Sequence, residues 1–295
     1  MSTQAFMDRS SLQVLEPGQV RHGAVPVRPF ICRGWLSDPA ALGPAHPGWT
    51  GHNVEVCRLP ADSSDVAVAS FRLREMGATT SMPVTDVFQL QSAQVASSTA
   101  GPENIYVFGG RTPPAFLDEA FWPGGYDYCG SSNYIASAGI RARLHYDLWQ
   151  AFLLQVHGQK RVRLYPPSDY SFLYPIHHLE SGFSRRSRVD VRAPDYQRFP
   201  LARRLSSGIE IVLQPGDMLY LPCRWWHEVE ALSFSIGFNR RFKVGPLEYF
   251  SQAAAQGWEC LRGRYWYRTA ADLPGRTVTE LLRNGVEALR SRARP

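Results

Sequence analysis

Two histidines and one aspartate have the types and the spacing to hold a metal ion. In the run Leu144-His145-Tyr146-Asp147, the two candidate ligands are separated by one residue. On a β-strand, residues i and i+2 point to the same face, so His145 and Asp147 would project together. His227, far along the chain, would complete a set of two histidines and one carboxylate, which leaves three open positions on an octahedral iron(II). An H-x-D pair also arises by chance in a chain with eight histidines, and His227 alone fits a buried structural histidine.

A lysine in a second segment sharpens this interpretation. In Lys160-Arg161-Val162-Arg163-Leu164-Tyr165, strand alternation places Lys160 on the apolar face with Val162 and Leu164. An ammonium group on a core-facing surface needs an anion, either an internal carboxylate or the carboxylate of a ligand. Beside an iron(II) site, the far carboxylate of 2-oxoglutarate is a natural partner, because its other end chelates the metal. The alternative is that Lys160 extends from the strand end to solvent.

Many short strands are expected to position these residues. Turn residues separate β-rich runs from Ser132 to Phe242, which favours a mainly β fold with a closed or double-sheet architecture. The expected strands are 53–58, 66–74, 104–108, 133–144, 151–156, 160–165, 209–213, 218–221 and 232–238. We expect a flexible tail over residues 1–20, one domain over residues 21–245, and a helical extension over residues 246–295 that could form a homodimer contact.

Composition and charge exclude several other classes of protein. The 295 residues carry a formal net charge of +6, with no block of basic residues interleaved with aromatics, so nucleic-acid binding is not expected. The five cysteines contain no C-x-x-C pair, which argues against a disulfide framework or a zinc-thiolate site and favours a cytoplasmic location. No signal-like start and no membrane-spanning apolar run is present in the sequence.

Several motifs in one order resemble a known family. They are His145-Tyr146-Asp147, Gly158-Gln159-Lys160-Arg161, Tyr165-Pro166-Pro167, Leu173-Tyr174-Pro175, residues 194–200 (PDYQRFP), residues 215–222 (PGDMLYLP), and Trp225-Trp226-His227. Together they resemble the Jumonji C, cupin-like hydroxylases, and in particular the asparaginyl hydroxylases among them. The similarity is collinear from about Asn133 to Phe242.

The resemblance implies a fold, a set of ligands and a reaction. The fold would be a double-stranded β-helix, or jelly roll, in which His145, Asp147 and His227 hold iron(II). Lys160 would bind the far carboxylate of 2-oxoglutarate, with Tyr106 reaching the same carboxylate and Asn239 near the metal. The reaction would be hydroxylation of an unactivated C–H bond, which consumes O2 and 2-oxoglutarate and yields succinate and carbon dioxide. The substrate would be a peptide or protein side chain or an amino-acid-like metabolite.

The departures from the family pattern concern the cosubstrate and the substrate. Ala142 and Ala151 stand where family members have a threonine and an asparagine that touch the cosubstrate. Arg185, Arg186 and Arg241 stand at positions that would contact the substrate, so hydroxylation of asparagine does not follow, and guanidinium groups at these positions suit carboxylates. The alternative function is a metal-binding, non-catalytic binding or sensor protein.

Aromatic residues are the candidates for walls that exclude water from such a site. Phe121, Trp122, Tyr126 and Tyr128 lie in one aromatic loop, and Trp225 and Trp226 precede His227. For Trp225 and Trp226, packing in the core is the favoured interpretation.

Overall fold

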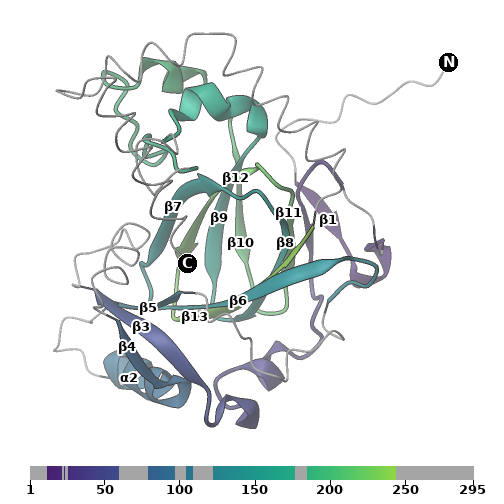
Figure 1. Cartoon of the computed structure of the whole chain (residues 1–295), viewed down its shortest axis with the longest axis vertical. Helices are drawn as coiled ribbons and strands as arrows, with labels where there is room; N and C mark the ends of the chain where they lie inside the picture. The colour runs from purple at the N-terminus through teal and green to yellow at the C-terminus, as the bar shows by residue number, and fades with distance from the viewer. Residues whose placement is uncertain are drawn as a thin grey trace, which may run out of the picture.

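Two β-sheets face each other in this computed structural model, which describes residues 12–21, 23, 26–59, 79–96, 104–108, 122–176 and 185–243 (Figure 1). The larger sheet has nine strands, in the spatial order β1 (Gln13–Leu15), β2 (Phe30–Cys32), β11 (Met218–Leu221), β8 (Gln150–His157), β13 (Ser235–Phe242), β6 (Tyr128–Ala136), β5 (Asn104–Phe108), β3 (Asn53–Leu59) and β4 (Thr80–Pro83). The smaller sheet has four strands, in the order β10 (Ile209–Leu213), β9 (Lys160–Tyr165), β12 (Trp226–Ala231) and β7 (Arg141–Tyr146). Except for the parallel pair β1 and β2, the strands pair antiparallel. The chain is therefore mainly β, as the sequence predicts, with the double-sheet architecture of a cupin-like jelly roll.

Helical segments lie outside the two sheets. The α-helix α2 (Val84–Ala96) lies beside β3 and β4 at one edge of the large sheet (Figure 1). The 3-10 helices η1 (Pro17–Gln19), η2 (Pro39–Leu42) and η3 (Pro47–Trp49) belong to the N-terminal part. The 3-10 helices η5 (Pro167–Leu173) and η6 (Pro200–Arg204) form a cap at one end of the small sheet (Figure 1).

The two sheets enclose an interior that is apolar at one end. Val162 and Leu164 of β9 pack against Leu153 of β8 and Leu219 of β11, so the inner faces of the two sheets share one buried cluster. The outer face of the large sheet is buried against a separate cluster that includes Trp49, Ile135 and Phe238. Because strand alternation assigns every second residue to each face, this packing also fixes which polar residues point into the interior.

The expected strands are mostly present, with two differences that affect the site. The run 133–144 is two strands, β6 and β7, joined by a turn at residues 137–140. His227 does not simply follow β11, because it lies within a further strand, β12, which the sequence interpretation did not include. Residues 66–74 and 246–295 lie outside the described residues, and so does the proposed homodimer contact.

The N-terminal expectation needs a correction. Residues 13–15 form β1 at the edge of the large sheet, and Val20 is buried in the core, so the loose tail expected over residues 1–20 does not hold for this part. The first turn of η2 is capped by the Asp38 carboxylate, which accepts from the Ala41 amide at 3.2 Å. Among the described residues, no helix is long and apolar enough to span a bilayer.

Candidate metal centre

His145, Asp147 and His227 come together at one point in the interior. One potential ligand atom from each residue lies within 4.8 Å of the other two. The rings of His145 and His227 have centroids 4.1 Å apart, and the His227 Nε2 atom lies 3.9 Å from the Asp147 Oδ2 atom. The direct cross-strand pairing of His145 on β7 with His227 on β12 creates this arrangement. Two imidazoles and one carboxylate at these distances can hold one divalent metal ion.

Backbone contacts orient both imidazole rings. The Nδ1 atom of His145 lies 2.8 Å from the Arg143 carbonyl oxygen, and the Nδ1 atom of His227 lies 3.0 Å from the Trp225 carbonyl oxygen. A carbonyl oxygen can only accept, so Nδ1 carries the proton in each neutral ring and the Nε2 lone pair is left for a metal. The geometry therefore selects the tautomer that a metal ligand needs.

The electrostatics of the site keep His145 and Asp147 in the protonation states that a metal requires. Burial, together with the neighbouring His227, lowers the pKa of His145 to about 3, so this imidazole is neutral near pH 7. Burial acts to raise the pKa of the Asp147 carboxyl. The neighbouring imidazoles and the guanidinium groups of Arg185 and Arg241 outweigh burial and hold this pKa below its usual value. Neutral imidazoles and an ionised carboxylate are the forms that bind metal ions.

Lys160 lies in the interior, as strand alternation predicts. The side chains of β9 alternate between buried and half-buried, and Lys160 is only 3% exposed. Its Nζ atom donates to the Tyr134 carbonyl oxygen at 3.5 Å and lies 6.0 Å from the centre of the Tyr134 ring. Burial lowers the pKa of Lys160 to about 7. In the described part of the chain no carboxylate pairs with this ammonium group, so neither the internal partner nor the path to solvent accounts for it.

The side chains and backbone next to Lys160 between the sheets are polar or small. A Cβ atom at Gly237 would lie 2.7 Å from the Lys160 Nζ atom and 3.2 Å from the Gln155 Oε1 atom, so glycine at this position makes room for the ammonium group. The Gln155 Nε2 atom donates to the carbonyl oxygens of His157 and Gly158, at 2.7 and 2.9 Å. Its Oε1 atom and the Asn239 Oδ1 atom are buried and have no hydrogen-bond partner among the described residues, but both are acceptors and cannot pair with a carboxylate. The group that fits an anionic ligand such as a dicarboxylate is the Lys160 ammonium itself, which is buried and can donate.

Tyr134 is a residue that the sequence interpretation missed. It lies on the same face of β6 as Ser132, its hydroxyl shares a hydrogen bond with Ser132, and burial raises its pKa to about 12. The phenol hydroxyl therefore stays protonated and can donate a hydrogen bond to an anion bound beside Lys160. The alternation of Ser132, Tyr134 and Ala136 along the predicted strand was the available signal. The backbone of Tyr106 in β5 pairs with Ala136 next to this face, but its side chain lies outside the described residues.

The predicted substrate residues surround the metal centre from two sides. Arg241 extends from the inner face of β13, and its charge acts on Asp147. Arg185 and Arg186 precede Ser187 beside β7, where the Tyr146 amide donates to the Arg185 carbonyl oxygen at 3.0 Å and His145 forms an isolated bridge with Arg186. Ala151, at a position where a cosubstrate contact is expected in the family, is the direct cross-strand neighbour of Arg241.

The aromatic loop does not form a wall of this centre. Tyr126 and Tyr128 pack against Phe242, and Trp122 belongs to the same cluster on the outer face of the large sheet. The prediction that these residues exclude water from the site is wrong, and Phe121 lies outside the described residues. Trp225 and Trp226 are buried in two core clusters, as favoured from the sequence. The buried apolar surface of the interior is aliphatic instead, formed by Leu153, Val162 and Leu164.

Comparison with known proteins gives the family. The cupin-like domain family matches residues 73–248. The tRNA wybutosine-synthesizing protein 5 of Gallus gallus is 35% identical over 123 residues, which cover 42% of this chain and 36% of that protein. The Jumonji C domain-containing protein 5 of Drosophila melanogaster is 37% identical over 138 residues, covering 42% and 33%. The lysine-specific demethylase 8 of Xenopus tropicalis is 40% identical over 103 residues, covering 34% and 23%.

These matches span about a third or less of the length of each relative, whereas the family match spans more than half of this chain. The match to the cupin-like domain family agrees with the two-sheet fold. The chain therefore belongs to the cupin-like domain family and is similar to Jumonji C domain-containing proteins.

Proposed function

We propose that this chain is an iron(II)- and 2-oxoglutarate-dependent oxygenase that hydroxylates an unactivated C–H bond of a peptide or protein side chain or of an amino-acid-like metabolite. The observation that carries the proposal is the coexistence, between the same two sheets, of a group of two histidines and one aspartate with a buried lysine that lacks a carboxylate partner in the described part of the chain. Iron(II), when bound with 2-oxoglutarate and dioxygen, would supply the oxidising power, with one oxygen atom passing to succinate and the other to the new hydroxyl group.

The protein residues would then hold and orient the reactants. His145, Asp147 and His227 would fix one face of the metal, since each imidazole already presents Nε2 to the common point. Lys160 would bind the far carboxylate of the cosubstrate, with the Tyr134 hydroxyl available as a donor beside it, and Asn239 would lie near the metal. Tyr106 remains a proposed contact to the same carboxylate. The aliphatic wall of Leu153, Val162 and Leu164 would exclude water from the interior.

The names of the relatives are consistent with more than one final product of the C–H oxidation. One relative is called a lysine-specific demethylase and another a tRNA wybutosine-synthesizing protein. Hydroxylation of an N-methyl carbon gives an unstable product that loses formaldehyde, so demethylation and stable hydroxylation start from the same C–H oxidation. Stable hydroxylation is proposed here, and mass spectrometry separates a gain of one oxygen atom from the loss of a methyl group.

Ala142 and Ala151 favour a second candidate, a non-catalytic binding or sensor protein that keeps the metal ligands. Both positions carry a methyl group where a hydrogen-bonding side chain would touch the cosubstrate in the family pattern. A protein of this kind would bind the metal ion without turning over 2-oxoglutarate.

Anaerobic titration distinguishes the two functions. Adding iron(II) and then 2-oxoglutarate to the wild-type protein is expected to give the weak visible charge-transfer band of the chelated metal, and admission of air is expected to release succinate. Asp147→Ala should lose both signals, because two imidazoles alone hold the metal poorly. A folded wild-type protein that shows neither the band nor succinate would contradict the oxygenase and favour the sensor.

A further inference from the structure

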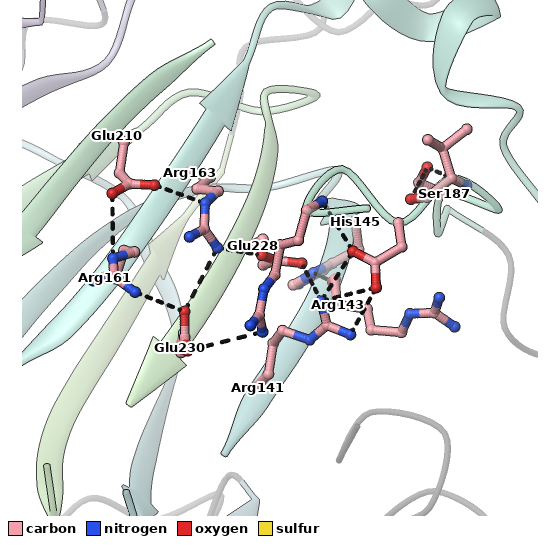
Figure 2. A network of polar contacts seen from close by, with 12 residues as sticks. Arg141, Arg143, His145, Arg161, Arg163, Ser187, Glu210, Glu228 and Glu230 are labelled. Carbon is pink, nitrogen blue, oxygen red and sulfur yellow. Dashed lines mark hydrogen bonds and ion pairs between the residues drawn. The ribbon is translucent and has the colours of Figure 1, made fainter. Parts of the chain in front are cut away.

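The arginines on the outer face of the small sheet are neutralised within the protein (Figure 2). Arg163 donates to Glu228 at 2.7 Å and to Glu210 at 2.8 Å. Arg141 lies 3.1 Å from Asp190 and 3.3 Å from Glu228. Arg161 lies 3.2 Å from Glu230. Each of these guanidinium groups has a carboxylate partner, so the outer face offers little net charge to a ligand.

Arg241 on the inner face is different. Its Nη2 atom donates to the Ser132 hydroxyl at 3.3 Å, and within the described ranges no carboxylate forms an ion pair with it. The guanidinium group lies over Gly130, where a Cβ atom would come within 3.3 Å of Nη2. Ala151, its neighbour on β8, also has a small side chain. Small residues at these two positions therefore give the guanidinium group room to lie along the inner face of the sheet.

Arg185 brings a second guanidinium group, from the segment that lies beside β7. Its backbone has a φ of 73°, in the left-handed region, and two backbone hydrogen bonds fix it: its carbonyl oxygen accepts from Tyr146 at 3.0 Å and its amide donates to the Ile176 carbonyl oxygen at 3.3 Å. The part of the chain that the structure describes holds no carboxylate paired with Arg185. Because Tyr146 lies between His145 and Asp147, its hydrogen bond to Arg185 places the Arg185 backbone beside the candidate metal ligands, and the charges of Arg185 and Arg241 both act on Asp147.

The segment that carries Arg185 also concentrates the charge of the protein. Residues 185–205 contain seven arginines and two aspartates, a net charge of +5, compared with +6 for the whole chain. Some of its arginines cover aromatic rings, as Arg203 does over Tyr196 at 4.6 Å and Arg204 over Phe172 at 5.1 Å. Aromatic faces covered in this way are poor platforms for nucleic-acid bases, whereas the field of the segment attracts small anions and acidic peptides.

We propose that the substrate presents a carboxylate group to Arg241 and Arg185 beside the metal ligands. Two guanidinium forks on either side of one carboxylate match its two oxygens, and such charge-assisted pairs are stronger than hydrogen bonds to an amide. The carboxylate belongs to an aspartate or glutamate side chain of a peptide or to a free amino acid. The proposal rests on the proposed function for the reaction, but the binding of the carboxylate can be measured separately.

The test measures binding to protein loaded with Mn(II) and 2-oxoglutarate, a combination that blocks turnover. Calorimetric titrations compare acid and amide pairs: free aspartate with asparagine, free glutamate with glutamine, and a ten-residue peptide of alternating glutamate and serine with its glutamine counterpart. At least one acid member is expected to bind about 10- to 100-fold more tightly than its amide partner. The free and peptide pairs identify the source of the carboxylate.

Three matched variants locate the effect. Arg241→Gln and Arg185→Gln are each expected to reduce the preference for the acid at least tenfold, with affinities for Mn(II) and 2-oxoglutarate within about threefold of wild type. Arg198→Gln removes one charge from the same segment, where this residue lies over the Phe199 ring, and is expected to leave the preference unchanged.

Four outcomes would overturn the proposal. They are binding of amides as tight as that of acids, a preference that survives in both site variants, loss of Mn(II) or 2-oxoglutarate binding instead of acid binding, and no binding by any acid in the panel. Failure of the proposed oxygenase function would be recognised by another result, the lack of the iron(II) and 2-oxoglutarate band in the wild-type protein. A preference for carboxylates could still be measured in that case.

Discussion

At the residue scale, the least ordinary feature is a lysine whose burial lowers its pKa to about 7. Folding takes this ammonium out of water and gives it a carbonyl oxygen in place of a carboxylate. A buried cation without an anion lowers the stability of the protein. This cost is consistent with a binding site in which an anionic ligand pairs with the ammonium group. The residue whose burial lowers the stability of the ligand-free protein is thus the one proposed to bind the cosubstrate.

The affinity for 2-oxoglutarate should therefore depend on pH. The ligand-free lysine loses its proton as the pH rises through about 7, and only its charged form pairs with the dianion. Above that pH, binding must first restore the proton, so the affinity is expected to fall roughly tenfold per pH unit between pH 7.5 and 9. Titration of the Mn(II)-loaded protein with 2-oxoglutarate at several pH values measures this slope.

Two variants control this prediction. Lys160→Met should bind 2-oxoglutarate weakly at every pH and have a higher free energy of unfolding near pH 7, while Mn(II) binding stays close to wild type. Gly237→Ala places a methyl group where the ammonium lies and should also weaken 2-oxoglutarate binding. A wild-type affinity that is flat from pH 7.5 to 9 would contradict the assignment of the carboxylate to Lys160.

At the scale of elements, β12 presents a candidate metal ligand on one face and two glutamates, of which Glu228 is buried, on the other. His227 points to the interior, whereas Glu228 points to the arginines of the outer face and is only 2% exposed (Figure 2). Glu228 bridges Arg141 of β7 and Arg163 of β9, the two strands that flank β12 in the small sheet. This bridge therefore holds together the strands that carry His145, His227 and Lys160.

Neutralising Glu228 should destabilise the protein much more than neutralising an exposed member of the same network. Glu228→Gln removes the buried carboxylate that Arg141 and Arg163 share, leaving Arg141 with Asp190 and Arg163 with Glu210, and is expected to lower the free energy of unfolding by about 3 kcal/mol. Glu210→Gln, whose side chain is 53% exposed, should cost less than about 1 kcal/mol. Urea denaturation of both variants measures the difference, and equal losses would show that burial of Glu228 does not govern the network.

The same strands explain what the sequence could and could not predict. The shared face of His145 and Asp147 and the inward direction of Lys160 follow from local alternation, which the sequence displays directly. The strand β12 was missed because its outer face is charged, and Glu228 and Glu230 resemble a loop until their arginine partners on neighbouring strands are known. Tyr134 and Gly237 lie next to Lys160 because one sheet packs on the other, and local sequence patterns do not indicate that contact.

At the scale of the whole molecule, the two sheets contribute different parts of the site. The small sheet and the residue after its strand β7 supply the metal ligands and Lys160, while the large sheet supplies Tyr134, Asn239 and Arg241 from its inner face. A diacid that chelates the metal at one end and pairs with Lys160 at the other would contact both sheets. Binding of such a ligand should stabilise the whole fold, because the unfolded chain cannot form the site.

This arrangement predicts that metal and 2-oxoglutarate stabilise the protein cooperatively. At concentrations about 100-fold above the dissociation constant, 2-oxoglutarate should add about 2.7 kcal/mol of stability to the Mn(II)-loaded protein, and far less to the metal-free protein, which lacks the chelated end. That gain corresponds to a rise in Tm of roughly 5–10 °C for a domain of this size, measurable by thermal denaturation. Glutarate is the matched control, since it keeps both carboxylates but lacks the 2-oxo group that chelates, so its effect should be small with or without Mn(II). Equal stabilisation by 2-oxoglutarate in the metal-free protein, or by glutarate in the loaded protein, would place the diacid away from the metal and contradict the shared site.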